Sequence, residues 1–79
     1  MKTNDIKKGM RIRLANDWEG TMMDNKRGNI RFAEVEGYYT EMGSVYAHDI
    51  VAVLVEGKWV SVEHTEVQLE CKRINEFLF

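Results

Sequence analysis

The fold is decided by residues 9–36, GMRIRLANDWEGTMMDNKRGNIRFAEVE. Between Met10 and Leu14, apolar residues alternate with two arginines, a period that places one side of a strand in a core and the other in water. Gly20 opens a second such run and Ile30 a third. Glycine at the start of a strand permits the sharp bend that a small barrel needs at its corners. The stretch therefore predicts three short antiparallel strands joined by two turns.

Turn-forming residues separate these strands. Asn16 and Asp17 supply the first turn, and residues 24–29, DNKRGN, are the strongest turn signal because Asp, Asn and Gly tolerate positive φ. The second turn superficially resembles a calcium-binding loop, but Lys26 occupies the third ligand position and no Glu occupies the twelfth. We therefore expect no metal ion in this turn.

The third strand, residues 30–36, is expected to point Ile30 and Phe32 inward and Arg31 outward. A bulge near Ala33 would then return Val35 to the core. On this interpretation the outward arginines of the first and third strands share one surface with the tip of the second turn. The predicted basic patch consists of Arg11, Arg13, Lys26, Arg27 and Arg31.

Aromatic residues supply a second candidate binding region. Trp18 follows the first turn, where it either plugs the barrel end or is exposed, and the usual burial of tryptophan favours the core. Residues 37–43 form a polar loop with adjacent Tyr38 and Tyr39, whose rings and hydroxyls are typical of interfaces. The alternative packs one tyrosine and exposes the other. The candidate binding residues here are Trp18, Tyr38 and Tyr39.

The second half of the chain predicts two more strands. Residues 44–49 contain a strand end and a single helical turn. Residues 50–55, IVAVLV, are a short β-branched apolar run that indicates a central strand. A tight turn at 56–57 leads to a closing strand at 58–63, in which Trp59 and the two valines lie on opposite faces.

The last segment changes to a helical period. Thr65 and Gln68 form a capping-box signature, and Glu66 favours a helix start. A helix of this length is marginal in water by itself, so its apolar stripe must dock on the barrel, on a second copy or on a partner, and its own barrel is favoured. Leu69, on the opposite face, hints at a further contact. The predicted helix interface consists of Val67, Cys71, Ile74, Phe77 and Leu78.

These elements predict a mainly β fold, a small SH3-like antiparallel barrel of about five strands with a C-terminal α-helix. The barrel would occupy residues 1–63 and the amphipathic helix residues 64–79, packed on the barrel or on a partner. At 79 residues there is room for one domain, which buries only about 60% of the surface of its unfolded chain. We therefore expect a folded single domain of modest stability.

The net charge is −2, but the two halves differ in sign. Up to Arg31, eight basic residues face four acidic ones, whereas from Phe32 onward three basic residues face nine acidic ones, giving +4 and −6. Such a bipolar chain can carry a basic binding face without the high isoelectric point of a dedicated nucleic-acid-binding protein. Charges scattered over solvated strand faces are the alternative interpretation.

The sequence contains none of the common enzyme motifs: no P-loop, dinucleotide glycine loop, HExxH or paired-cysteine spacing. Neighbouring strand residues point to opposite faces, which argues against joint catalysis within the pairs at 48–49 and 63–64. Convergence of His48, His64 and Cys71 on a metal is disfavoured, because such spacing is common by chance. We predict a protein that is not an enzyme, with no catalytic residue, metal or cofactor.

Cysteine content and hydropathy indicate the cellular compartment of the protein. The single Cys71 cannot form an internal disulfide, and no run of about eighteen apolar residues could span a membrane. The first residues, MKTND, are not followed by the apolar segment of a signal peptide. These features predict a cytoplasmic protein without membrane association.

Three segments carry a family resemblance: GMRIRL at 9–14, GTMMD at 20–24 and NIRFAEV at 29–35. They resemble the SH3-like barrels of KOW-motif proteins, in which an opening glycine and an alternating strand precede a second glycine that begins the next strand. The likeness covers residues 6–55 and implies binding of RNA or DNA. KOW proteins are usually more basic, and the acidic helix after residue 64 is not part of their pattern.

A second resemblance is to small photosynthetic proteins with an SH3-like fold, namely the SH3-like subunit of photosystem I and the variable chain of ferredoxin-thioredoxin reductase. It is carried by IRF at 30–32 and YAHDIV at 46–51. The short, proline-free chain is also similar to small bacteriophage proteins, including those of phages that infect cyanobacteria. A phage origin would place the protein in the host cytoplasm.

Two functional hypotheses follow. The first is a non-enzymatic binding module that docks on a protein or protein complex, because catalytic motifs are lacking, the two halves have opposite charge and the tyrosine loop resembles an interface. The alternative is a KOW-like module that binds RNA or DNA through the basic patch, with aromatic residues available for stacking. The chain would be a monomer, or a homodimer through its C-terminal helix.

Overall fold

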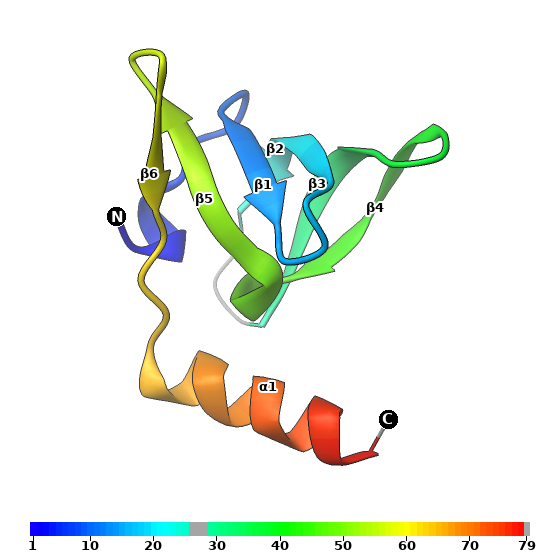
Figure 1. The fold of residues 1–79 in the computed structure, drawn as a ribbon, viewed down its shortest axis with the longest axis vertical. Helices are drawn as coiled ribbons and strands as arrows, with labels where there is room; N and C mark the ends of the chain where they lie inside the picture. The colour runs from blue at the N-terminus through cyan, green and yellow to red at the C-terminus, as the bar shows by residue number, and fades with distance from the viewer. Residues whose placement is uncertain (26–28, 79) are drawn as a thin grey trace.

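The computed structural model describes residues 1–25 and 29–78, with side chains described up to residue 74. Within these residues the chain forms six strands and a C-terminal helix (Figure 1). Two 3-10 turns, η1 (Thr3–Asp5) and η2 (Ala47–Asp49), precede β1 and β5 respectively. The other elements are β1 (Arg11–Leu14), β2 (Glu19–Asp24), β3 (Ile30–Glu36), β4 (Thr40–Tyr46), β5 (Ile50–Val55), β6 (Lys58–Ser61) and α1 (Glu66–Leu78).

The strands form one antiparallel sheet in the order β4-β3-β2-β1-β5-β6. After the meander β2-β3-β4, the chain passes through η2 and returns as β5 beside β1 (Figure 1). An isolated parallel bridge also joins Lys2 to Glu63. The predicted class, mainly antiparallel β with a C-terminal helix, is confirmed, and the topology is compatible with an SH3-like fold. The sheet has six strands rather than about five and does not close, because β4 and β6 are its edges in the described residues.

The core lies on one face of this sheet. Alternation in β1 buries Ile12 and Leu14, as the sequence predicts. Gly20 in β2 is required by a close approach of the neighbouring strand, because a Cβ there would lie 2.5 Å from the carbonyl oxygen of Glu34. The remaining buried apolar residues are Ile6, Met22, Ala33, Ala47, Ile50, Val53 and Val62.

Strand β3 has the opposite phase to the one predicted. Arg31 is buried at 2% exposure, whereas Ile30 and Phe32 are exposed. The expected bulge near Ala33 is absent, since all seven residues of β3 pair with β4 without a shift. The irregularity lies in β2 instead, at Met23, between the pairs that Met22 and Asp24 make with β3. That extra residue places Ala33 opposite the buried Met22, and Arg31 follows Ala33 to the interior by the two-residue period.

Buried Arg31 is held by polar groups from distant parts of the chain. Its guanidinium donates hydrogen bonds to Oδ1 of Asn25 and, at 2.9 Å, to Oδ1 of Asn4. Asn25 in turn donates from Nδ2 to the carbonyl oxygens of Thr3 and Ile6, each at 2.7 Å. The arginine therefore ties the segment around η1 to the sheet, and burial lowers the pKa of Arg31.

The turn predictions agree with the backbone where the structure describes it. Asp17 has φ 69°, and the β5–β6 turn places Glu56 at φ 50° and Gly57 at φ 79°, as a tight hairpin turn requires. The predicted turn at 24–29 falls partly outside the described residues. The loop expected at 37–43 is shorter, because β4 already begins at Thr40.

Helix α1 begins with the predicted capping box. The backbone N–H of Thr65 donates to Oε1 of Gln68 at 2.9 Å, and the N–H of Gln68 donates to Oγ1 of Thr65 at 3.2 Å. The helix crosses one end of the sheet and packs against η2 (Figure 1).

The favoured docking of the helical stripe on its own barrel is wrong for Val67 and Ile74, which are 73% and 49% exposed. Among the helical residues with described side chains, Gln68 is the buried one, and Cys71 is half-buried. The side chain of Gln68, which closes the capping box, therefore faces the rest of the protein, whereas Val67 and Ile74 of the stripe face outward. The side chains of Phe77 and Leu78 are outside the described set, and docking of the stripe on a partner stays a prediction.

Candidate interaction surfaces

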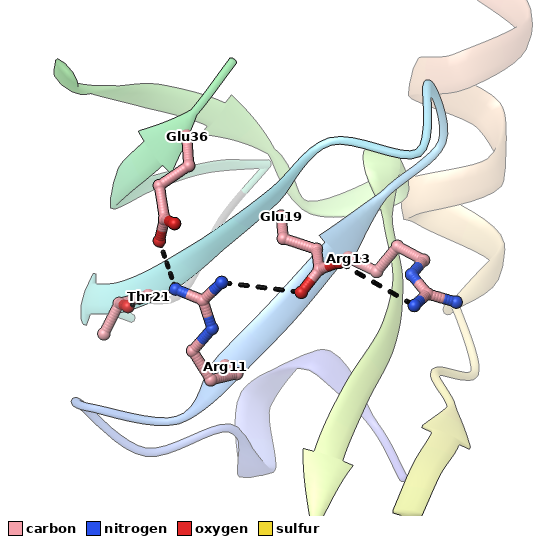
Figure 2. A network of polar contacts seen from close by, with 5 residues as sticks. All are labelled: Arg11, Arg13, Glu19, Thr21 and Glu36. Atoms are coloured by element: carbon pink, nitrogen blue, oxygen red, sulfur yellow. Dashed lines mark hydrogen bonds and ion pairs between the residues drawn. The ribbon is translucent and has the colours of Figure 1, made fainter. Parts of the chain in front are cut away.

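The outer face of strands β1 to β3 carries an arginine enclosed by acidic residues (Figure 2). Strand pairing places Arg11 opposite Thr21, and Glu19 opposite Glu36 on the next strand. Arg11 Nη2 lies 3.4 Å from Glu19 Oε1, while Nη1 donates to Glu36 Oε2 and, at 3.2 Å, to Thr21 Oγ1. The hydrogen bond to Glu36 raises the pKa of Arg11. The positive charge of Arg11 is thus neutralised within the sheet.

Arg13 lies beside this network on the same strand. Its Nη2 is 3.9 Å from Glu19 Oε2, and its guanidinium carbon lies 4.2 Å from the centroid of the Trp59 ring. The ring therefore contributes a cation–π contact from β6, while the carboxylate contributes a weak ion pair from β2. Trp59 and the buried Val62 lie on opposite faces, as predicted.

The three described arginines of the predicted basic patch do not share one face. Arg11 and Arg13 share a face, and each has an acidic neighbour. The expected outward position of Arg31 is wrong, because the phase of β3 turns it to the opposite, buried side of the sheet. Lys26 and Arg27 lie outside the described residues.

The three candidate aromatic residues, by contrast, lie together at one end of the sheet. We call Trp18, Tyr38 and Tyr39 the aromatic surface. The Trp18 ring packs against the backbone of Gly37, and Tyr38 meets it edge-on, with centroids 5.5 Å apart and planes at 82°. Trp18 is 38% exposed, so the core position favoured for it is wrong, and Tyr38 and Tyr39 are 90% and 78% exposed.

A small hollow opens between these rings. Its volume is about 150 Å³, and it is lined by Trp18, Val35, Gly37, Tyr38, Tyr39 and Glu41. Pockets for drug-sized ligands usually measure roughly 300–1,000 Å³, so this hollow suits a single side chain. Ring faces and a carboxylate together favour a positively charged group.

A second exposed surface was missed by the sequence interpretation. Strand pairing aligns Ile30 with Tyr46 and Glu34 with Met42, so the outward side chains of β3 and β4 form a continuous face. We call Ile30, Phe32, Met42 and Tyr46, all of them exposed, the β3–β4 apolar face. The alternation in residues 40–46, TEMGSVY, is the signal for it, but the loop expected at 37–43 covers half of that stretch.

The histidines and the cysteine have separate surroundings. His48 is buried, stacks on Tyr46 with centroids 5.0 Å apart, and places Nδ1 3.2 Å from Oδ1 of Asn29. His64 Nε2 lies 2.8 Å from the carbonyl oxygen of Ile50. Across residues 1–25 and 29–78, no group of three or more His, Cys, Asp or Glu side chains is arranged to hold a metal ion.

Comparisons with known proteins give no relative. No family model, no curated protein and no solved structure significantly matches the chain. The KOW-like and photosynthetic resemblances therefore gain no support beyond the compatible topology. Among the helices of the described chain, none is long and apolar enough to cross a membrane.

Proposed function

We propose that the protein is a non-enzymatic binding module that docks on a protein or protein complex through the aromatic surface. The observation that carries the proposal is the exposure of Tyr38 and Tyr39, at 90% and 78%, beside a tryptophan held against Gly37. Tryptophan, tyrosine and arginine dominate the energetics of protein interfaces. Large rings lose little conformational entropy on binding, which favours them as anchors.

The chemistry of the hollow suggests what the partner presents. Glu41 lines it together with the three rings, so a lysine or arginine side chain would find a carboxylate and aromatic faces at once. Such a cation–π contact contributes about 0.5–2 kcal/mol, depending on how far it is desolvated. The proposed partner segment is therefore basic, and the remaining contact is apolar area on Tyr38 and Tyr39.

Nucleic-acid binding is the weaker candidate. It requires free positive charge on the outer sheet face, and Arg11 and Arg13 there contact Glu19 and Glu36. Arg31, the third strand arginine of the patch, is buried. A phosphate backbone approaching this face would meet the two carboxylates as well as the guanidinium groups.

The test is affinity capture from nuclease-treated lysate with the wild-type chain and the double variant Tyr38→Ala/Tyr39→Ala. The control is Lys58→Ala, an exposed residue on β6 at the opposite edge of the sheet. We expect specific partners to be retained by the control and lost by the double variant.

Equal capture by all three proteins would remove the aromatic surface from consideration. Loss of every partner on nuclease treatment, with affinity that falls steeply with salt and is weakened in Arg11→Ala/Arg13→Ala, would instead support nucleic-acid binding.

A further inference from the structure

Within the described residues, strand β4 is an edge of the sheet, and half of its backbone groups are directed away from β3. The N–H of Ala47 donates to the carbonyl of Asn29 at 2.6 Å, and the N–H of Gly37 donates to the carbonyl of Tyr39 at 3.1 Å. These bonds flank the β3–β4 ladder, in which hydrogen-bonded and non-hydrogen-bonded pairs alternate. Glu41, Gly43 and Val45 therefore bond to β3. The groups that point to the free edge belong to Thr40, Met42, Ser44 and the N–H of Tyr46, whose carbonyl, at the N-cap of η2, accepts the first bond of that turn.

This edge lacks the usual protection against pairing. Natural edge strands are short, bulged, or marked by lysine or proline. Strand β4 pairs with β3 over seven residues without a bulge, and its sequence, TEMGSVY, contains neither lysine nor proline. Its single charged residue, Glu41, lies opposite Val35. A groove of about 360 Å³ lies between residues 44–46 and the start of the β1–β2 turn at Leu14–Asn16.

Within the described residues, nothing requires a glycine at Gly43, which lies at the middle of β4. Its φ is not positive, and a Cβ at this position would meet nothing within 4 Å. Glycine inside a strand is destabilising relative to alanine. It often marks a place where another backbone comes close. Within the described residues no other backbone lies against Gly43, which leaves space for the backbone of another chain.

We propose that β4 pairs with β4 of a second copy of the chain, antiparallel about a two-fold axis at Gly43. Outward backbone groups pair only with outward groups, and this register uses all four such residues of each strand. Thr40 of one copy then lies opposite Tyr46 of the other, and Met42 lies opposite Ser44. The two Gly43 residues face each other as a non-hydrogen-bonded pair, the closest kind, with Cα atoms about 4.5 Å apart.

Charge and polarity are compatible with this self-pairing. Glu41 of one copy lies opposite Val45 of the other, so no like charges are opposed. Pairing also joins the β3–β4 apolar faces of the two copies into one larger apolar surface on one side of a continuous sheet. Because the same patch serves both copies, the interface is isologous and closes at the dimer. This β4 interface is different from the one that the sequence predicts, in which a homodimer forms through the apolar stripe of α1.

Amide hydrogen exchange measured by NMR on the full chain tests the pairing directly. At low concentration, the amides of Gly43 and Val45 are protected by their bonds to β3, while those of Met42 and Ser44 exchange freely. At high concentration, we expect Met42 and Ser44 to become protected as well. Unchanged exchange at these two residues while the chain dimerises would overturn the proposal.

A pair of double variants tests the register. Met42→Lys/Ser44→Lys opposes lysines across the interface, whereas Met42→Lys/Ser44→Glu opposes lysine and glutamate at the same positions. Two such contacts form per dimer, so sedimentation equilibrium should show the dissociation constant rising at least about tenfold for the lysine pair relative to the mixed pair. Far-UV circular dichroism checks that both remain folded.

A wild-type chain that remains monomeric at millimolar concentration overturns the proposal. So does a dimer whose stability is equal in the two variants, because its interface would lie elsewhere. Tyr38 and Tyr39 are unchanged throughout, so failure of this dimer is separable from failure of the aromatic surface to bind a partner.

Discussion

Trp18 packs on Gly37 so closely that a Cβ on residue 37 would lie 2.4 Å from the Cζ3 atom of the indole ring. The tryptophan from the β1–β2 turn thus rests on bare backbone at the β3–β4 turn. The adjoining Tyr38 meets the same ring at 82°. One glycine therefore determines how the rings of the aromatic surface are arranged.

Replacing Gly37 should disturb that arrangement. In Gly37→Ala the new methyl group displaces the indole, and we expect the free energy of unfolding to fall by about 1–3 kcal/mol, as for other overpacked sites. Near-UV circular dichroism and urea denaturation provide the readouts. The matched control is Gly43→Ala, measured at a low concentration at which the chain is monomeric, where free space predicts a gain of at most about 1 kcal/mol. Equal losses in both variants would contradict the close packing.

Arg31 should not be replaceable by lysine. Its guanidinium reaches Asn25 and Asn4 together, and a single ammonium cannot reproduce that fork. We expect Arg31→Lys to lower the free energy of unfolding by about 1–3 kcal/mol, because a buried acceptor loses its donor. Arg73→Lys on the exposed helix face is the control and should stay within about 0.5 kcal/mol. A stability unaffected by Arg31→Lys would show that the buried contacts are dispensable.

The acidic enclosure of Arg11 should add little stability. The pairs with Glu19 and Glu36 are partly exposed to solvent, and we expect Arg11→Met to cost less than about 1 kcal/mol, with the difference shrinking in high salt. Ile12→Ala, at the neighbouring buried position, should cost about 2–5 kcal/mol. Urea denaturation at two salt concentrations compares them. Similar losses of unfolding free energy in the two variants would contradict this expectation. They would show that the ion pairs of Arg11 stabilise the sheet as much as a buried core residue does.

The capping box should hold the first turn of α1. Thr65→Ala removes the hydroxyl that accepts the Gln68 N–H, and the expected loss is about 1 kcal/mol in the local opening free energy of the helix. Amide exchange within α1 measures it. Because the helix packs against η2 at one end of the sheet, β-strand amides should change less. Lys72→Ala is the control, and a similar change there would mean that the cap is not the cause.

The elements that the sequence predicted correctly are those whose evidence is local. Alternation in Met10 to Leu14, the turn at Asp17 and the Thr65–Gln68 capping box each depend on residues within one turn or strand, and each is confirmed. The mainly β class follows from summing such signals. The short chain connections then leave few antiparallel arrangements.

Local sequence signals could not predict which face of β3 is buried. Alternation in 30–36 is equally regular whichever side faces inward, and the choice depends on the extra residue at Met23 in another strand. Asn25 and Asn4, whose side-chain oxygens accept hydrogen bonds from buried Arg31, likewise lie outside the strand. For the candidate site, the aromatic residues could be named from the sequence, but their contact through Gly37 and the outward face of β4 depend on tertiary packing.

The bridge between Lys2 and Glu63, together with pairing of β1 with β5, has a consequence for the order of folding during synthesis. The β2-β3-β4 meander joins neighbours in sequence, so its strand pairings need no residue beyond Tyr46. The first strand, although made earlier, lacks its second neighbour until β5 emerges, and the segment around Lys2 waits for Glu63. Contacts between such distant residues slow the folding of small β proteins to roughly milliseconds to seconds. The N-terminal residues of this sheet are thus the first to be translated and among the last to be fixed in place.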